Sequence, residues 1–77
     1  MEELLTGIAV GLVDKPEAVS VTKDEPDEEG VIVYHLNVDE GDIGRVIGKQ
    51  GKIAKAIRVV LRTAAARQNL KVRLEIG

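Results

Sequence analysis

Cysteine is missing from this 77-residue chain, and so are tryptophan and phenylalanine, which leaves Tyr34 as the only aromatic residue. Without cysteine, no disulfide can hold the fold, and no thiolate can act as a nucleophile or metal ligand. With a single aromatic ring, the chain cannot offer the row of rings on which many nucleic-acid-binding proteins stack bases. Its core, and any apolar binding surface, must therefore be aliphatic.

Residues that commonly carry catalysis are also scarce. His35 is the only histidine and Ser20 the only serine. A Ser–His pair across a hairpin of these two segments would have no third member and no identifiable oxyanion donor. No set of residues has the spacing of metal ligands. The sequence therefore predicts a protein that is not an enzyme and that uses no cofactor and no metal.

A long hydrophobic run is absent as well. The longest apolar stretch, residues 4–13, is interrupted by threonine and glycine. It is about half the ~20 residues that a membrane-spanning helix needs. The chain starts with the acidic pair Glu2-Glu3, whereas an export signal starts with basic residues. We expect a soluble, cytoplasmic protein that does not bind membranes.

The charges are divided unequally along the chain, although the net charge is only −2. Residues 1–42 hold 12 acidic and two basic residues, and residues 43–77 hold nine basic residues and one acidic residue. A positive half of this kind is suited to a polyanion, while the acidic half limits non-specific binding. The mildly acidic overall composition therefore does not argue against a nucleic-acid partner.

Hydrophobic periodicity predicts six elements in the order α-β-β-α-α-β. Apolar residues recur at helical spacing in the first element and alternate with polar residues in the strands. Because 77 residues suffice for one domain and not for two, we assign residues 1–77 to a single domain. The predicted elements are a helix at 3–13, strands at 18–23 and 31–38, a short helix capped by Asp42, a helix at 52–67 and a strand at 70–76.

The three predicted strands should form one mixed sheet. The acidic turn 24–30 joins the first two strands as an antiparallel hairpin, and the two-helix crossover that follows is long enough to make the last two strands parallel. We therefore expect an α+β fold in which three helices cover one face of a three-stranded mixed sheet. The predicted core stripe of helix 52–67 is Ile53, Ile57, Val60, Leu61 and Ala64.

The most informative segment joins the two consecutive helices, and it reads Gly48-Lys49-Gln50-Gly51. Gly48 can end the first helix in a left-handed conformation, and Gly51 allows close backbone approach where the next helix starts. The N-terminus of that helix offers free N–H groups, and Arg45, Lys52 and Lys55 add positive charge nearby. The segment is thus a candidate phosphate-binding corner. It is not a nucleotide P-loop, because the glycine spacing is wrong and no Ser or Thr follows the lysine.

The run Val-Ile-Gly-Lys-Gln-Gly-Lys-Ile at 46–53 resembles the G-x-x-G signature of KH domains, which lies between two helices. The α-β-β-α-α-β order is that of the type II, bacterial KH domain. The chain length and the segments 12–17, 34–38 and 42–48 further resemble the bacterial single-KH proteins of the KhpA family. The resemblance extends over the whole chain.

This resemblance implies a specific binding site and partner. The G-x-x-G loop would clamp the backbone of about four nucleotides of single-stranded RNA, over an aliphatic groove with strand 31–38 on its far side. The family further implies an RNA chaperone that acts with a KH protein called KhpB and influences cell-wall synthesis and cell length. The implied RNA-binding residues are Gly48, Lys49, Gln50 and Gly51 in the loop, Arg45, Lys52 and Lys55 around it, and Ile43, Val46, Ile47 and Ile53 in the groove.

Several features have two readings in the sequence alone. The basic residues of the last helix and strand (Arg58, Arg62, Arg67, Lys71 and Arg73) are either a solvated face or part of the RNA contact. Val59 lies away from the predicted core stripe and could form part of a homodimer or of a contact with a KhpB-like partner. The alternative to RNA binding is a protein-interaction module in which nucleic-acid binding is incidental, because a fold does not by itself fix a function.

Overall fold

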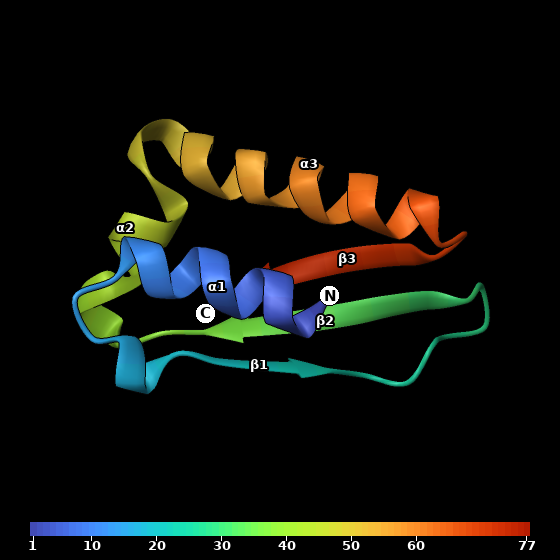
Figure 1. The fold of residues 1–77 in the computed structure, drawn as a ribbon, viewed down its shortest axis with the longest axis horizontal. Helices are drawn as coiled ribbons and strands as arrows, with labels where there is room; N and C mark the ends of the chain where they lie inside the picture. The colour runs from blue at the N-terminus through green and yellow to red at the C-terminus, as the bar shows by residue number, and fades with distance from the viewer.

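The computed structural model describes residues 1–77 and has the predicted order of helices and strands (Figure 1). Three short 3₁₀ turns, labelled η, stand between the longer elements. The helices are α1 (Glu2–Leu12), α2 (Ile43–Ile47) and α3 (Lys52–Arg67), the strands are β1 (Ser20–Lys23), β2 (Val31–Asn37) and β3 (Lys71–Ile76), and the 3₁₀ turns are η1 (Pro16–Ala18), η2 (Glu40–Asp42) and η3 (Lys49–Gly51).

The three strands form one mixed sheet in the order β1-β2-β3. β1 pairs with β2 in antiparallel register, with Thr22 opposite His35, and β2 pairs with β3 in parallel register, with Tyr34 opposite Leu74. Both edges of β2 are therefore occupied, whereas β3 has one free edge. This arrangement confirms the predicted α+β class and strand directions.

The helices lie on one face of this sheet, with α1 in front of the strands and α3 along the β3 side in Figure 1. Alternation places the side chains of Tyr34 and Leu36 in the core, while His35 between them faces away and is half-buried. All three helices and two strands contribute to one aliphatic core. The buried residues of this core are Leu5, Ala9, Tyr34, Leu36, Val46, Ile57, Leu61 and Leu74.

The buried stripe of α3 differs from the predicted one. Ile57 and Leu61 are buried as expected, but Val60 is 43% exposed. The other fully enclosed positions are Ala54 and Ala65, which continue the i, i+3 and i+4 spacing of the stripe. Val60 and Leu61 are three and four residues after Ile57, so helical spacing allows both on one buried face. The orientation of α3 on the sheet turns Leu61 into the core and leaves Val60 outside it.

Two strands begin later than the sequence indicated. Pro16 starts a 3₁₀ turn that extends to Ala18, so β1 begins only at Ser20. Asn69 has a φ of 58°, and the N–H of Leu70 donates back to the carbonyl oxygen of Ala65 at the end of α3 over 2.9 Å. β3 therefore begins at Lys71, and Leu70 stays partly exposed. None of the helices combines the length and the apolar character that a membrane-spanning helix requires.

Candidate nucleic-acid interface

The loop between α2 and α3 reverses the chain within four residues. Gly48 follows the last residue of α2 and has φ 77° and ψ 172°. The N–H of Gly51 donates to the carbonyl oxygen of Gly48 over 3.1 Å, which closes the 3₁₀ turn η3. Gln50 and Gly51 both adopt left-handed conformations, with φ values of 59° and 74°, and α3 starts at the next residue.

The two glycines are required for different reasons. Gly48 ends α2 with the positive φ predicted for it, although its ψ is extended, and the close approach predicted at Gly51 occurs at Gly48 instead. A Cβ on Gly48 would lie 2.5 Å from Cγ1 of Ile53, so the close approach occurs at Gly48. Its positive φ with an extended ψ belongs to a region that essentially only glycine adopts. A Cβ on Gly51 would meet only open space, so this position needs glycine only for its left-handed backbone. The missing side chain of Gly48 therefore lets the loop pack closely on Ile53, and the left-handed conformation of Gly51 sets the direction in which α3 starts.

The lysines at this corner carry unpaired positive charge. Lys49, Lys52 and Lys55 are all exposed. None of them takes part in any of the six ion pairs of the structure. Because α3 starts between Lys49 and Lys55, its N-terminal dipole adds to the same positive potential. The corner is electrostatically suited to a phosphate backbone.

The predicted apolar residues of the groove are not equally accessible. Ile47 is 37% exposed, and Ile43 and Ile53 are partly exposed, so all three can contact a ligand. Val46 is 0% exposed and belongs to the core cluster. It supports the groove from inside the core and does not line its surface.

Arg45 and Asp42 have different partners from those expected. The guanidinium of Arg45 lies 2.9 Å from the Asp14 carboxylate and 3.3 Å from that of Asp42, so its charge is shared with two acids. Asp42 precedes α2 but makes no capping hydrogen bond to it, which contradicts the predicted capping role. Its carboxylate instead accepts hydrogen bonds from the backbone N–H groups of Asp14 and Lys15, each over 3.1 Å.

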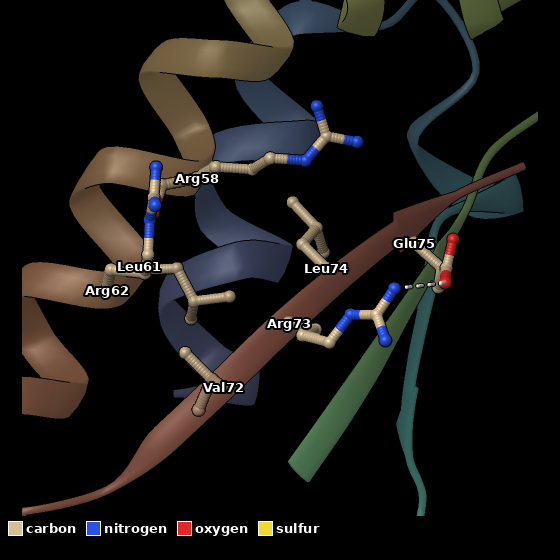
Figure 2. A pocket seen from close by; sticks show the side chains of 7 residues that line it. All are labelled: Arg58, Leu61, Arg62, Val72, Arg73, Leu74 and Glu75. Atoms are coloured by element: carbon tan, nitrogen blue, oxygen red, sulfur yellow. Dashed lines mark hydrogen bonds and ion pairs between the residues drawn. The ribbon is translucent and has the colours of Figure 1, made fainter. Parts of the chain in front are cut away.

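A cleft of about 310 Å³ lies between α3 and the edge strand β3 (Figure 2). Its floor is apolar and its rim carries three guanidinium groups and one carboxylate, with Arg73 and Glu75 4.0 Å apart. Figure 2 shows Arg58 reaching from α3 toward β3 above the apolar floor. The floor residues are Leu61, Val72 and Leu74, and the rim residues are Arg58, Arg62, Arg73 and Glu75.

This cleft, which we call the α3–β3 cleft, continues the basic corner. Lys55, Arg58 and Arg62 have i, i+3 and i+7 spacing, so they follow one flank of α3 from the loop to the cleft. The wall of this cleft opposite α3 is β3. The contact predicted for strand 31–38 on the far side of an RNA groove stays a prediction for its side chains. β2 is the central strand, and its backbone groups are used on both edges.

The sequence named the basic residues of this cleft but left their role open. Helical spacing was a visible signal for Arg58 and Arg62, whereas nothing local indicated that β3, with Arg73 and Glu75, would lie beside them. The Ser–His arrangement considered for catalysis does not form. Nε2 of His35 lies 2.9 Å from a carboxylate oxygen of Asp24, and Ser20 is paired with Asn37.

Comparison with known proteins gives one consistent result. A family model described as the KH domain of KhpA/KhpB matches residues 2–76. A curated relative from Listeria monocytogenes, named RNA-binding protein KhpA, is 49% identical over 76 residues, covering 99% of this chain and 97% of its own. A relative of the same name from Clostridium perfringens is 51% identical, with 99% of each chain covered. A third, from Chlamydia trachomatis, is 49% identical, with 99% of this chain and 95% of its own covered.

Proposed function

The chain belongs to the KhpA/KhpB family of KH domains, and from this premise we propose that it binds single-stranded RNA by clamping the backbone on the Gly48–Gly51 loop. The family consists of RNA-binding proteins and is not one of enzymes, in agreement with the predicted absence of catalysis. The observation that carries the proposal is the exposed, unpaired Lys49 held between two glycines with positive φ. A module used only for assembly would not need a free charge at that position.

The surface beside the Gly48–Gly51 loop supports a path for a single strand of RNA. The RNA phosphates would contact the loop amides and the side chains of Lys49 and Lys52, whose positive charges have no partner within the protein. The bases would then pass over Ile47 and Ile53 toward the α3–β3 cleft, whose apolar floor and polar rim are suited to flat rings with polar edges. Because aromatic rings are absent from this path, affinity should come from aliphatic contacts, hydrogen bonds and charge.

A salt titration tests the proposal most directly. Fluorescence anisotropy of a labelled single-stranded RNA should give a log–log slope of observed affinity against salt of about −2, which corresponds to ~3 phosphates at about −0.7 each. A hairpin duplex of the same base composition should bind much more weakly, because its bases cannot enter an aliphatic groove. Absence of binding to either RNA would overturn the proposal and favour the protein-interaction module.

The α3–β3 cleft gives a separate prediction. Arg58→Gln should weaken RNA binding by about three- to tenfold, since a hydrogen bond to a charged group contributes about 1.5 kcal/mol and is partly replaced by the amide. Lys71→Gln is the matched control, because Lys71 is an exposed basic residue that lines neither the cleft nor the surface beside Val60. Equal affinities for the two variants would exclude the cleft from the RNA path.

We propose that a second copy of the chain binds the surface of α3 around Val59 and Val60, which we call the outer flank of α3. Val59 is 54% exposed and Val60 43%, and the two line a shallow apolar hollow of about 410 Å³. Thr63 also lines this hollow, and its hydroxyl donates to the carbonyl oxygen of Val59 over 2.8 Å, so it adds no unpaired donor to the surface. Two such flanks related by a two-fold axis would bury each other. Pairing would also join two short RNA sites and raise avidity.

Dimerisation can be tested on its own by sedimentation equilibrium. The wild type should show a concentration-dependent mass approaching that of a dimer, and Val59→Glu should remain monomeric, because a buried unpaired carboxylate is strongly unfavourable. Val10→Glu, at a 42% exposed position on α1, is the control and should still dimerise. A dimeric Val59→Glu would place the contact elsewhere. A wild type that is monomeric alone but associates with a KhpB-like protein would support the heterodimer instead.

The finer biological role rests on the family resemblance. We propose a cytoplasmic RNA chaperone that works with a KhpB-like KH protein in post-transcriptional control linked to cell-wall synthesis and cell length. The α3–β3 cleft and the hollow beside Val59 are lined by different residues of α3, which supports a proposal in which RNA and a protein partner are bound at the same time.

A further inference from the structure

Asp42 is the only charged or polar residue that is buried, with 3% of its surface exposed. Both carboxylate oxygens are used, one by the N–H of Asp14 and the other by the N–H of Lys15. Nε of Arg45 lies 3.3 Å from the first oxygen, and the same guanidinium contacts the Asp14 carboxylate at 2.9 Å. No buried side-chain polar atom of the protein lacks a partner.

These contacts join two segments that are distant in the sequence. Asp14 and Lys15 follow the end of α1, and they are 28 and 27 residues from Asp42. A buried carboxylate is strongly unfavourable unless hydrogen bonds and an opposite charge compensate it. The contact can therefore form only when the turn after α1 and the start of α2 have one fixed relative position.

That position matters because α2 carries the RNA loop at its other end. α2 has only five residues, so it cannot hold its own conformation without external contacts. Its C-terminal end is fixed by the packing of Gly48 on Ile53, and its N-terminal end is fixed by the contacts of Asp42. Release of the N-terminal end would let α2 turn and would change the direction in which Lys49 and the loop amides point.

We propose that Asp42 and Arg45 are positioning residues that orient the RNA loop through the turn after α1. In this role, which rests on the proposed RNA-binding function, the Arg45 guanidinium is occupied by Asp14 and Asp42 and does not contact a phosphate. Asp42 contributes to RNA binding although its charge has the same sign as the ligand.

The sign of the effect separates positioning from simple electrostatics. Removal of a negative charge near a polyanion site should strengthen RNA binding if charge alone decides. Loss of a positioning residue should weaken it instead. Asp42→Asn keeps the size of the side chain but turns an amide N–H₂ toward one of the backbone donors, so one of the two bonds is lost.

The experiment measures RNA anisotropy and loop amide signals together, at 10 °C and after circular dichroism has shown that each variant is folded. Asp42→Asn should weaken binding about tenfold, the factor that corresponds to 1.4 kcal/mol. Arg45→Gln should also weaken binding, with the salt slope unchanged. A direct phosphate contact by Arg45 would instead lower the slope by about 0.7. Glu17→Gln, an exposed acid in the neighbouring turn, is the control and should bind as the wild type does or slightly more tightly.

Nuclear magnetic resonance keeps the two proposals distinguishable. In Asp42→Asn, the amide signals of residues 49–52 should shift and exchange faster with solvent, whereas those of Glu17→Gln should not. If the wild type binds no RNA but these signals shift, the proposed function fails and the positioning role stands. Unchanged loop signals in Asp42→Asn, or tighter RNA binding by it, would overturn the positioning role. A lowered salt slope in Arg45→Gln would overturn it for Arg45.

Discussion

Replacement of both Lys49 and Gln50 by aspartate should abolish measurable binding of single-stranded RNA. The double variant changes the charge of the loop by three units at the point where the phosphates are proposed to lie. Two charges about 4 Å apart in water interact by about 1 kcal/mol, so the change should cost about 3 kcal/mol, or more than a hundredfold in affinity. The dependence of any residual RNA affinity on salt should also become weaker, because fewer counterions are released on binding.

The domain should remain folded in this variant. Lys49 and Gln50 are exposed, and Lys49 has no ion-pair partner to lose. Gln50 already has a left-handed φ of 59°, a conformation that aspartate tolerates better than most residues. Circular dichroism should therefore match the wild type, and anisotropy should report only the loss of binding.

A matched control is available at the opposite end of α3. Asn69→Asp with Lys71→Asp makes the same change in charge, and Asn69 has a φ of 58°, close to that of Gln50. If the loop is a clamp, this control should retain most of its affinity. Equal losses in both double variants would indicate a diffuse attraction by the basic half of the chain and would contradict a specific site at the loop.

Gly48→Ala should destabilise the fold more than any other glycine replacement in the chain. The new Cβ would meet Ile53 at 2.5 Å, and the backbone of Gly48 lies in a region that alanine does not adopt without strain. Backbone strain of about 1–3 kcal/mol and overpacking of about 1–3 kcal/mol together suggest a loss of about 3 kcal/mol or more. A domain of this size has a free energy of unfolding of about 4–12 kcal/mol, so the variant should lose about a quarter or more of its stability.

Urea denaturation followed by circular dichroism measures this loss against two other glycines. Gly51→Ala should lose about 1–2 kcal/mol, because only its left-handed backbone opposes a side chain. Gly7→Ala, in the middle of α1 with open space at the Cβ position, should gain about 0.5–1 kcal/mol from higher helix propensity. If Gly48→Ala is no less stable than Gly51→Ala, the close packing on Ile53 does not constrain the loop.

The sequence determined those features that depend on neighbours along the chain. Helical spacing and alternation predicted the six elements, because burial on one face of a helix or strand repeats with a fixed period. The loop Gly48-Lys49-Gln50-Gly51 was identifiable because a positive φ and a charge between two glycines are local properties. Strand directions also followed from the lengths of the connections. The residues proposed to touch RNA in the loop remain predictions from this level.

Only the tertiary structure decided the features that depend on contacts between distant segments. Asp42 looked like a helix cap, but its partners are 27 and 28 residues away. Val60 looked like a core residue, but the orientation of α3 on the sheet left it partly exposed. The wall of the α3–β3 cleft opposite α3 is β3, since β2 lies in the centre of the sheet with both of its edges paired. Periodicity reports which face of an element is buried, whereas the packing of the whole chain sets what that face and its neighbours meet.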